Sequence, residues 1–143
     1  MIPLLVPPQA PLQELLHGPM IAPPPPPLRP SDLAVGLSTV GHGGRIVDRQ
    51  LFEGLGWAEG DRLSLRTEGA VLVAEPTTDI PPGAAMVVRA GFVRVPYRWR
   101  RRVNLFLGDR VLLLANSSRN RLAICTPTAI AEAFGPLLDG LSR

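Results

Sequence analysis

The hexapeptide GDRLSL occupies residues 60–65, and the similar hexapeptide GDRVLL occupies residues 108–113, 48 positions later. In both places the Gly-Asp pair follows apolar residues at helical spacing and precedes an alternating apolar run. Gly-Asp is typical of a turn, and the alternating run is typical of a strand. The chain of 143 residues is therefore predicted to contain two tandem copies of one structural unit.

Each copy predicts the same order of elements, which is strand, strand, helix, strand, strand. The first copy predicts strands at 34–40 and 45–47, a short helix that carries Leu51 and Leu55, and a hairpin of 61–65 with 70–75. The second copy predicts strands at 85–89 and 92–95, a short helix that carries Trp99 and Val103, and a hairpin of 109–115 with 121–125. The predicted fold class is therefore mainly β, with β-β-α-β-β repeated twice.

A single copy is too small to be stable, because four short strands and one short helix cannot bury both of their faces. Two copies can cover each other in one barrel. The apolar positions agree between the copies: Val47 with Val95, Leu51 with Trp99, Leu55 with Val103, Leu63 with Val111, and Leu65 with Leu113. We expect one barrel closed within the chain; the alternative pairs like copies across a dimer and gives two barrels.

The domain organisation follows from proline usage and apolar patterning. We expect residues 1–30, which include five consecutive prolines at 23–27, to form a disordered tail. Residues 31–127 are expected to form the barrel, with repeat one at about 34–76, a linker at 77–84 and repeat two at about 85–127. Residues 128–143 are expected to form a short C-terminal helix and tail. Its apolar face predicts packing on the barrel, and capture of a partner protein is the second interpretation: Ile130, Ala133, Phe134 and Leu137.

Charge is distributed unevenly along the chain, whose formal net charge is +3. Residues 1–88 contain five Arg and nine Asp or Glu, a net of −4, whereas residues 89–143 contain ten Arg and three acids, a net of +7. Every basic residue is arginine, whose planar guanidinium suits phosphates and guanine edges. This asymmetry predicts that the second half of the chain faces a polyanion.

The strand, turn and helix of each copy resemble the AbrB, MazE and SpoVT group of bacterial swapped-hairpin DNA-binding domains. The second copy reads GFVRVPYRWRRRVNLFLGD at 91–109, with a proline before the helix, and the first contains GRIV at 44–47 and LGWAEGD at 55–61. The resemblance covers about residues 34–127. It implies an AbrB-like swapped-hairpin barrel that binds duplex DNA through basic side chains on the first two strands, their loop and the helix start.

Carried onto this sequence, the resemblance implies DNA contacts from five arginines: Arg45, Arg49, Arg89, Arg94 and Arg98. Three further arginines extend the basic run along the helix: Arg100, Arg101 and Arg102. Consecutive helical residues lie about 100° apart, so these side chains cannot all face one groove. Two consecutive glycines, Gly43 and Gly44, leave the register of the strand at 45–47 open by one residue, and the sequence does not decide whether Arg45 faces solvent.

The predicted function is a sequence-specific DNA-binding transcriptional regulator, with duplex DNA as its partner. One alternative is an antitoxin whose tail binds a toxin protein while its barrel represses its own operon. Another is an interaction module that does not bind DNA, which the acidic first half favours. Association of the chain into a homo-oligomer is compatible with each of these functions.

No residue set in the sequence predicts catalysis, a cofactor or a metal. His17 and His42 have no third ligand at metal spacing, and Cys125 is the single cysteine. Asp61 and Asp109 recur as turn formers rather than as a catalytic pair. No apolar stretch approaches the roughly 18 to 20 residues of a membrane span, and the N-terminal residues lack a signal-peptide pattern. We expect a cytoplasmic protein that is not an enzyme.

Overall fold

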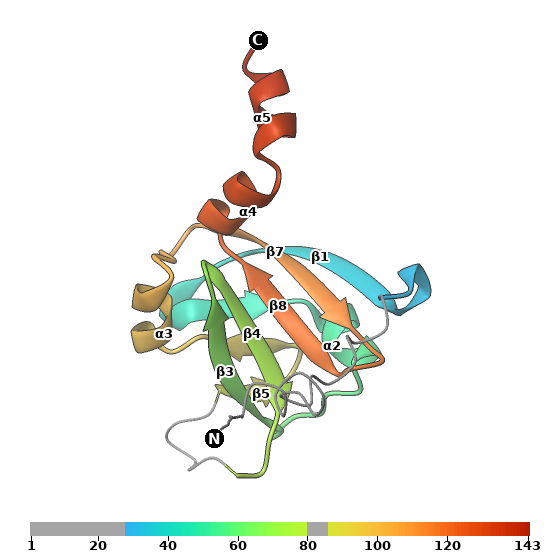
Figure 1. The fold of residues 1–143 in the computed structure, drawn as a ribbon. Helices are drawn as coiled ribbons and strands as arrows, with labels where there is room; N and C mark the ends of the chain where they lie inside the picture. Colours follow the sequence, from blue (N-terminus) through green and yellow to red (C-terminus); the bar gives the residue numbers. More distant parts are fainter. Residues whose placement is uncertain (1–27, 80–85) are drawn as a thin grey trace, which may run out of the picture.

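A computed structural model describes residues 28–79 and 86–143, which form a mainly β fold with a few short helices (Figure 1). Repeat one consists of β1 (Leu33–Thr39), β2 (Arg45–Val47), α2 (Arg49–Gly54), β3 (Arg62–Glu68) and β4 (Val71–Pro76). Repeat two consists of β5 (Met86–Arg89), β6 (Phe92–Arg94), α3 (Tyr97–Arg102), β7 (Arg110–Asn116) and β8 (Arg121–Cys125). Two 3-10 turns, η1 (Pro30–Asp32) and η2 (His42–Gly44), flank β1.

The strands of the two repeats interleave in one antiparallel sheet. The strand order is β1-β7-β8-β4-β3-β5-β6-β2, so β1 of repeat one pairs with β7 of repeat two, and β5 of repeat two pairs with β3 of repeat one. The second strands pair with each other, as do the fourth strands. Each repeat therefore inserts its hairpin beside the first strand of the other, and the prediction of one barrel made from two β-β-α-β-β repeats is confirmed.

The two ends of the sheet approach each other and nearly close the barrel. An isolated bridge joins Gly41 to Arg45 at the turn between β1 and β2. The Val47 amide donates to the hydroxyl of Ser38 over 3.3 Å, which links the two terminal strands without a regular ladder. A closed barrel leaves few unpaired strand edges, and this near-closure leaves one short seam.

The repeated Gly-Asp pair joins the repeats to each other. The amide of Gly60 donates to the carbonyl of Val88 over 2.8 Å, and the amide of Gly108 donates to the carbonyl of Val40 over 2.7 Å. The amides of Val88 and Val40 donate in return to the carbonyls of the two aspartates, each over 2.8 Å. The repeated Gly-Asp pair therefore connects each hairpin, through backbone hydrogen bonds, to the first strand of the other repeat.

The conformation of the glycine and the side chain of the aspartate explain why the Gly-Asp pair occurs in both repeats. Gly60 and Gly108 have φ of 94° and 93°, a region that side chains with a Cβ rarely adopt. The carboxylate of Asp61 accepts from the Ala58 amide, and that of Asp109 accepts from the Phe106 amide, each over 2.9 Å. Both aspartates therefore act as turn formers, which agrees with the prediction.

Both repeats contribute to the core, which lies inside the barrel. Leu63 and Val111 occupy equivalent positions in the two repeats, and both are fully buried. Leu122 and Ile124 on β8 are also fully buried, and they lie opposite Ala74 and Leu72 on β4. Trp99 is partly buried and packs against this core, in the position that Leu51 takes in repeat one. The matched apolar positions of the two repeats therefore meet inside one barrel.

One predicted core pair is wrong. Val95 is fully buried, whereas the side chain of Val47 is 47% exposed. The buried residues of β2 and β6 are Ile46 and Val93, so equivalent positions of these two strands lie 47 residues apart instead of 48. The extra residue is accommodated at Gly43 and Gly44, whose φ values of 71° and 84° form a tight turn before β2. This turn shifts the strand by one position and exchanges its two faces.

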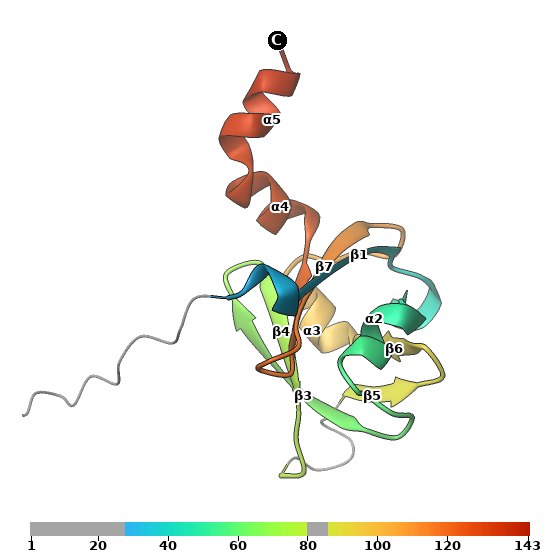
Figure 2. The same ribbon diagram turned by 90° about the vertical axis from the view of Figure 1, so that its right-hand side faces the viewer.

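The C-terminal residues form two helices rather than the single packed helix predicted within 128–143. They are α4 (Pro127–Ala133) and α5 (Gly135–Leu141), and Pro136 in the first turn of α5 separates them. Ala129 is buried against the barrel, but Phe134 and Leu137 are exposed, so the predicted apolar face is not covered. In Figure 2 the two helices extend away from the barrel.

The predicted tail at 1–30 lies outside the described residues except for residues 28–30, and most of the predicted linker lies outside them too. Among residues 28–79 and 86–143, no helix is long and apolar enough to cross a membrane.

Separating the repeats tests their interdependence. We expect residues 31–80 and 81–143, expressed as separate polypeptides, each to remain unfolded, because each hairpin lacks the strand beside which it inserts. An equimolar mixture should fold as a heterodimer, measured by circular dichroism and sedimentation velocity. Two independently folded homodimers would contradict the interleaved barrel.

The Gly-Asp turn can be tested by single substitutions. Gly108→Ala should lower the free energy of unfolding by at least about 1 kcal/mol, because alanine is strained at a φ near 93°. Gly54→Ala is the control, since a Cβ at this last residue of α2 meets nothing within 4 Å and alanine is the better helix former. Urea denaturation measures both variants, and equal stabilities would contradict this role of Gly108.

Candidate nucleic-acid interface

Strands β2 and β6 place two arginines side by side on the outside of the barrel. Ile46 and Val93 point into the core, so the alternate residues Arg45 and Arg94 point outward and lie directly opposite each other. The Arg45 guanidinium lies 4.2 Å from the centre of the Phe92 ring, and that of Arg94 lies 5.4 Å from it. The structure thus decides the orientation of Arg45 that the sequence left open.

The loop before β2 supports Arg94. Its guanidinium donates to the His42 carbonyl over 3.1 Å, and a Cβ at Gly43 would lie 2.6 Å from its Nη1 atom. Glycine at position 43 therefore leaves room for the arginine. His42 contributes its backbone to the site, and its predicted placement in a glycine loop is observed.

Helix α3 begins three residues after Arg94 and carries four arginines in different environments. Arg98 and Arg101 are exposed and lie three positions apart, on one side of the helix. Within the described residues, Arg98 has no hydrogen bond or ion pair. The side chains of Arg45, Arg94, Arg98 and Arg101, called the basic surface below, are not matched by any carboxylate within salt-bridge distance in the described residues.

Arg100 and Arg102 instead support the helix. The Nε atom of Arg100 donates to the Val95 carbonyl over 3.0 Å, and a Cβ at Gly44 would lie 2.8 Å from that atom. Arg100 is half-buried and packs beside the turn before β2. The guanidinium of Arg102 lies 4.4 Å from the centre of the Trp99 ring, which favours a cation–π contact.

Arg49 and Arg89 lie at the other end of β6. Arg49 is the first residue of α2 and lies close to Gly91. A Cβ added at Gly91 would lie 3.2 Å from the Cβ of Arg49. Together with Arg89, Arg49 lines a shallow depression of about 250 Å3 that also contains Glu53 and Glu59. These two arginines therefore lie in a mixed electrostatic environment, unlike Arg94 and Arg98.

The two helices differ in charge at equivalent positions. Along the 48-residue spacing, Arg98 corresponds to Gln50 and Arg101 corresponds to Glu53. Asp48 also caps α2, where its carboxylate accepts from the Leu51 amide over 3.0 Å, whereas Pro96 at the same place in repeat two gives no such cap. The electrostatic potential of this side of the barrel is therefore polarised toward α3.

An aromatic hollow beside α3 was not anticipated from the sequence. It measures about 640 Å3, and its apolar lining includes the exposed side chains of Tyr97, Phe106 and Leu107 beside Arg101. Phe106 and Leu107 precede Gly108, where repeat one has Ala58 and Glu59. Comparing the two copies position by position would have revealed this difference.

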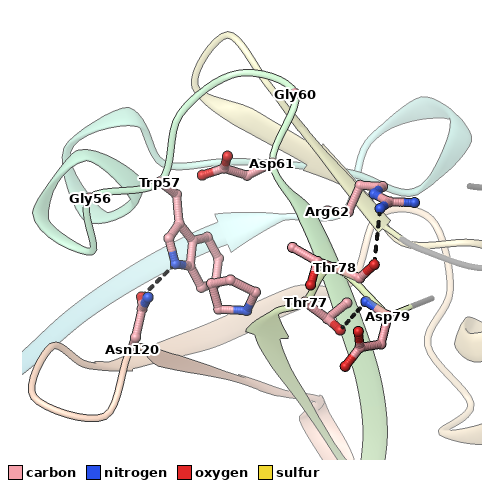
Figure 3. A pocket seen from close by; sticks show the side chains of 10 residues that line it. Gly56, Trp57, Gly60, Asp61, Arg62, Thr77, Thr78, Asp79 and Asn120 are labelled. Carbon is pink, nitrogen blue, oxygen red and sulfur yellow. Dashed lines mark hydrogen bonds between the residues drawn. The ribbon is translucent and has the colours of Figure 1, made fainter.

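A second depression, of about 580 Å3, is lined by residues that bond to each other (Figure 3). The Trp57 indole donates to the side-chain oxygen of Asn120 over 2.6 Å, and Arg62 donates to the Thr78 carbonyl over 3.4 Å. The Thr77 hydroxyl accepts from the Asp79 amide over 3.1 Å. The first contact joins the loop after α2 to the β7–β8 turn of the other repeat, and the other two hold the segment after β4 in place, which gives these residues a structural role.

Among the described residues, the side chains that could bind a metal or act as nucleophiles do not form a cluster. The described part of the chain contains no group of three His, Cys, Asp or Glu side chains that could hold a metal ion, and His17 lies outside it. Cys125 is buried, and burial raises the pKa of its thiol above the usual value. A thiol in this environment stays protonated near neutral pH and is a poor nucleophile.

No known protein family, curated protein or solved structure matches this chain. The resemblance to AbrB-like regulators thus stays a prediction carried by the sequence pattern, and the chemistry of the basic surface is the starting point for the function.

Proposed function

We propose that the chain is a transcriptional regulator that binds duplex DNA through the basic surface. The observation that carries this proposal is the outward-facing pair of Arg45 and Arg94 on the β2–β6 ribbon, without carboxylate partners among the described residues. Guanidinium groups without carboxylate partners suit phosphates at this spacing, and a two-stranded β-ribbon fits the width of the major groove. Arg98 and Arg101 extend the same positive charge along α3.

The chemistry of binding divides between the two sets of arginines. Phosphate contacts release counterions and supply affinity, whereas contacts to base edges supply sequence choice. Arg45 and Arg94 lie on the paired second strands of the two repeats, next to the pseudo-two-fold axis that relates the repeats. We therefore assign these two arginines to the groove. Arg98 and Arg101 on α3 are assigned to the flanking phosphates. No catalytic step and no cofactor form part of this function.

A protein-interaction module is the second candidate function. It is favoured by Tyr97, Phe106 and Leu107, which expose apolar surface beside the basic surface. An antitoxin would combine both activities, with the toxin bound elsewhere on the chain. Absence of any DNA binding at low salt would favour the interaction module over the regulator.

Charge reversal tests the basic surface. We expect Arg94→Glu with Arg98→Glu to lower the affinity for duplex DNA by at least about 100-fold at low salt, because one attractive contact in the groove and one to a flanking phosphate both become repulsive. The wild-type affinity should fall with salt, with a log–log slope of about −0.9 per phosphate neutralised. Fluorescence anisotropy with DNA fragments selected from genomic DNA measures both quantities.

A matched control changes the same charge elsewhere. Arg119→Glu with Arg143→Glu reverses two exposed arginines outside the basic surface, at the β7–β8 turn and the C-terminus. This variant should retain most of the wild-type affinity. Equal losses in the two double variants would mean that net charge alone drives binding, and the assigned surface would be wrong.

The polarity of the surface can be tested with a residue exchange between repeats. Glu53→Arg should raise DNA affinity several-fold, because it places in α2 the arginine that repeat two has at position 101. Arg101→Glu should lower affinity and make α3 resemble α2. Anisotropy titrations measure both, and an unchanged affinity for Glu53→Arg would place α2 away from the DNA.

A further inference from the structure

The outer face of β1 and β7 is apolar, and no element of the described residues 28–79 and 86–143 covers it. Ala115, Leu113 and Val111 point into the core, so the alternate residues on this strand pair point outward. The outward residues include five aliphatic side chains, called the apolar face below: Leu33, Val35, Leu37, Leu112 and Leu114. Val35 and Leu37 are 59% and 61% exposed. Exposed apolar side chains that are contiguous, rather than scattered singly, are candidates for an interaction site.

Repeat one provides an internal comparison for this face. Its β3 is the counterpart of β7, and Ser64 and Arg66 stand where Leu112 and Leu114 stand. Both hairpins belong to the same barrel, although β7 pairs with β1 at seven positions and β3 pairs with β5 at two positions among the described residues. The outward leucines of β7 lie beside Val35 and Leu37 of β1, and together these side chains form a surface that suits contact with a partner.

Helices α4 and α5 form an arm beside this face. In both views the arm rises from the side of the barrel on which β1 and β7 lie (Figure 1, Figure 2), and α4 contacts β7 and β8. Leu137 and Leu141 on α5 are 65% and 75% exposed. A helix of seven residues is unstable in water unless its apolar side packs against something. The arm is therefore a second apolar element without a cover.

We propose that the occupant of the apolar face is a second copy of this chain, whose arm lies on the face while its own face receives the first copy's arm. Such an exchange has two-fold symmetry and covers both uncovered elements of both copies at once. Charge favours it too. Residues 127–142 contain Glu132 and Asp139 but no basic residue, and the exposed Arg110 continues the outward row of β7 beside Leu112.

The size of the surfaces also favours reciprocal exchange. Two strands of seven residues present about 24 Å by 10 Å, or about 240 Å2, which is well below the roughly 800 Å2 per partner of a standard interface. An arm of fourteen helical residues, about 21 Å long and 10 Å wide, adds a similar area from each copy. A partner that contacted only the sheet would bind weakly, whereas exchange doubles the contact. The combined area, about 450 Å2 per partner, stays below that of a standard interface and corresponds to a weak dimer that forms at high protein concentration.

Sedimentation velocity of the full chain at about 10 to 200 µM tests the proposal. The wild type should reach twice the 15.4 kDa monomer mass as concentration rises. Leu112→Ser with Leu114→Arg introduces the type of residues found in repeat one, and Leu137→Ser with Leu141→Ser changes only the arm. Each pair should shift the chain to a monomer at all concentrations while the circular dichroism spectrum stays unchanged.

Phe106→Ala is the matched control, since it removes another exposed apolar side chain and installs the residue type found at position 58. This variant should dimerise like the wild type. A wild-type monomer at 200 µM would overturn the proposal, and would be expected if residues 1–27 or an unlike protein occupied the face. A dimer that survives both double variants, or that is lost in the control, would also overturn it.

Disulfide trapping distinguishes exchange from other dimers. In a Cys125→Ser background, chains with Val35→Cys are mixed with chains carrying Leu137→Cys and oxidised. Reciprocal exchange predicts a mixed disulfide dimer in preference to either like pair, because each arm cysteine faces the sheet cysteine of the other chain. Preferential formation of Val35→Cys pairs would instead indicate sheet-to-sheet packing and would overturn the arm exchange.

Discussion

Backbone hydrogen bonds between each Gly-Asp turn and the first strand of the other repeat hold this barrel together. Gly60 and Asp61 bond to Val88, and the counterpart turn bonds to Val40 in the same geometry. Because the bonds cross between repeats, neither hairpin can dock until the other repeat supplies its strand. The pairing of β2 with β6, and with it the outward orientation of Arg45 and Arg94, depends on that exchange.

The two repeats agree where they fill the core and differ where they meet solvent. Leu63 and Val111 occupy equivalent buried positions, because a close-packed interior tolerates little change in volume. Outside the barrel, Glu53 corresponds to Arg101, and Ser64 corresponds to Leu112. Surface substitutions cost little stability, so these positions are free to acquire separate functions. The differences produce a basic flank near α3 and an apolar flank on β1 and β7.

The proposed DNA contact and the proposed self-association use different sides of the barrel. The β2–β6 pair and the β4–β8 pair each join equivalent strands of the two repeats, so both pairs lie on the pseudo-two-fold axis. In the nearly closed sheet, β1 and β7 lie between β8 and β2, away from that axis. A dimer formed through the apolar face would thus leave both basic surfaces free. Two linked DNA-binding surfaces raise the effective local concentration of the second once the first has bound.

The sequence by itself determined the order of the elements and the tandem barrel, because glycine turns, strand alternation and helical spacing are local signals. The bounds of β2 were predicted correctly as 45–47, and Asp61 and Asp109 were recognised as turn residues. Five arginines were implied by the resemblance and three extended the basic run, but the sequence did not show which of the eight are exposed. The sequence also indicated a single packed helix at the C-terminus.

Tertiary structure decided the remaining features, since they depend on residues far apart in the chain. The turn at Gly43 and Gly44 set the register that exposes Val47 and turns Arg45 outward. The Val95 carbonyl and the space at Gly44 drew Arg100 inward and left Arg98 exposed. The apolar face appeared only when β1 paired with β7, which brought side chains nearly eighty positions apart onto one surface. Local pattern can specify an element, but the face that an element presents is fixed by its pairing partners.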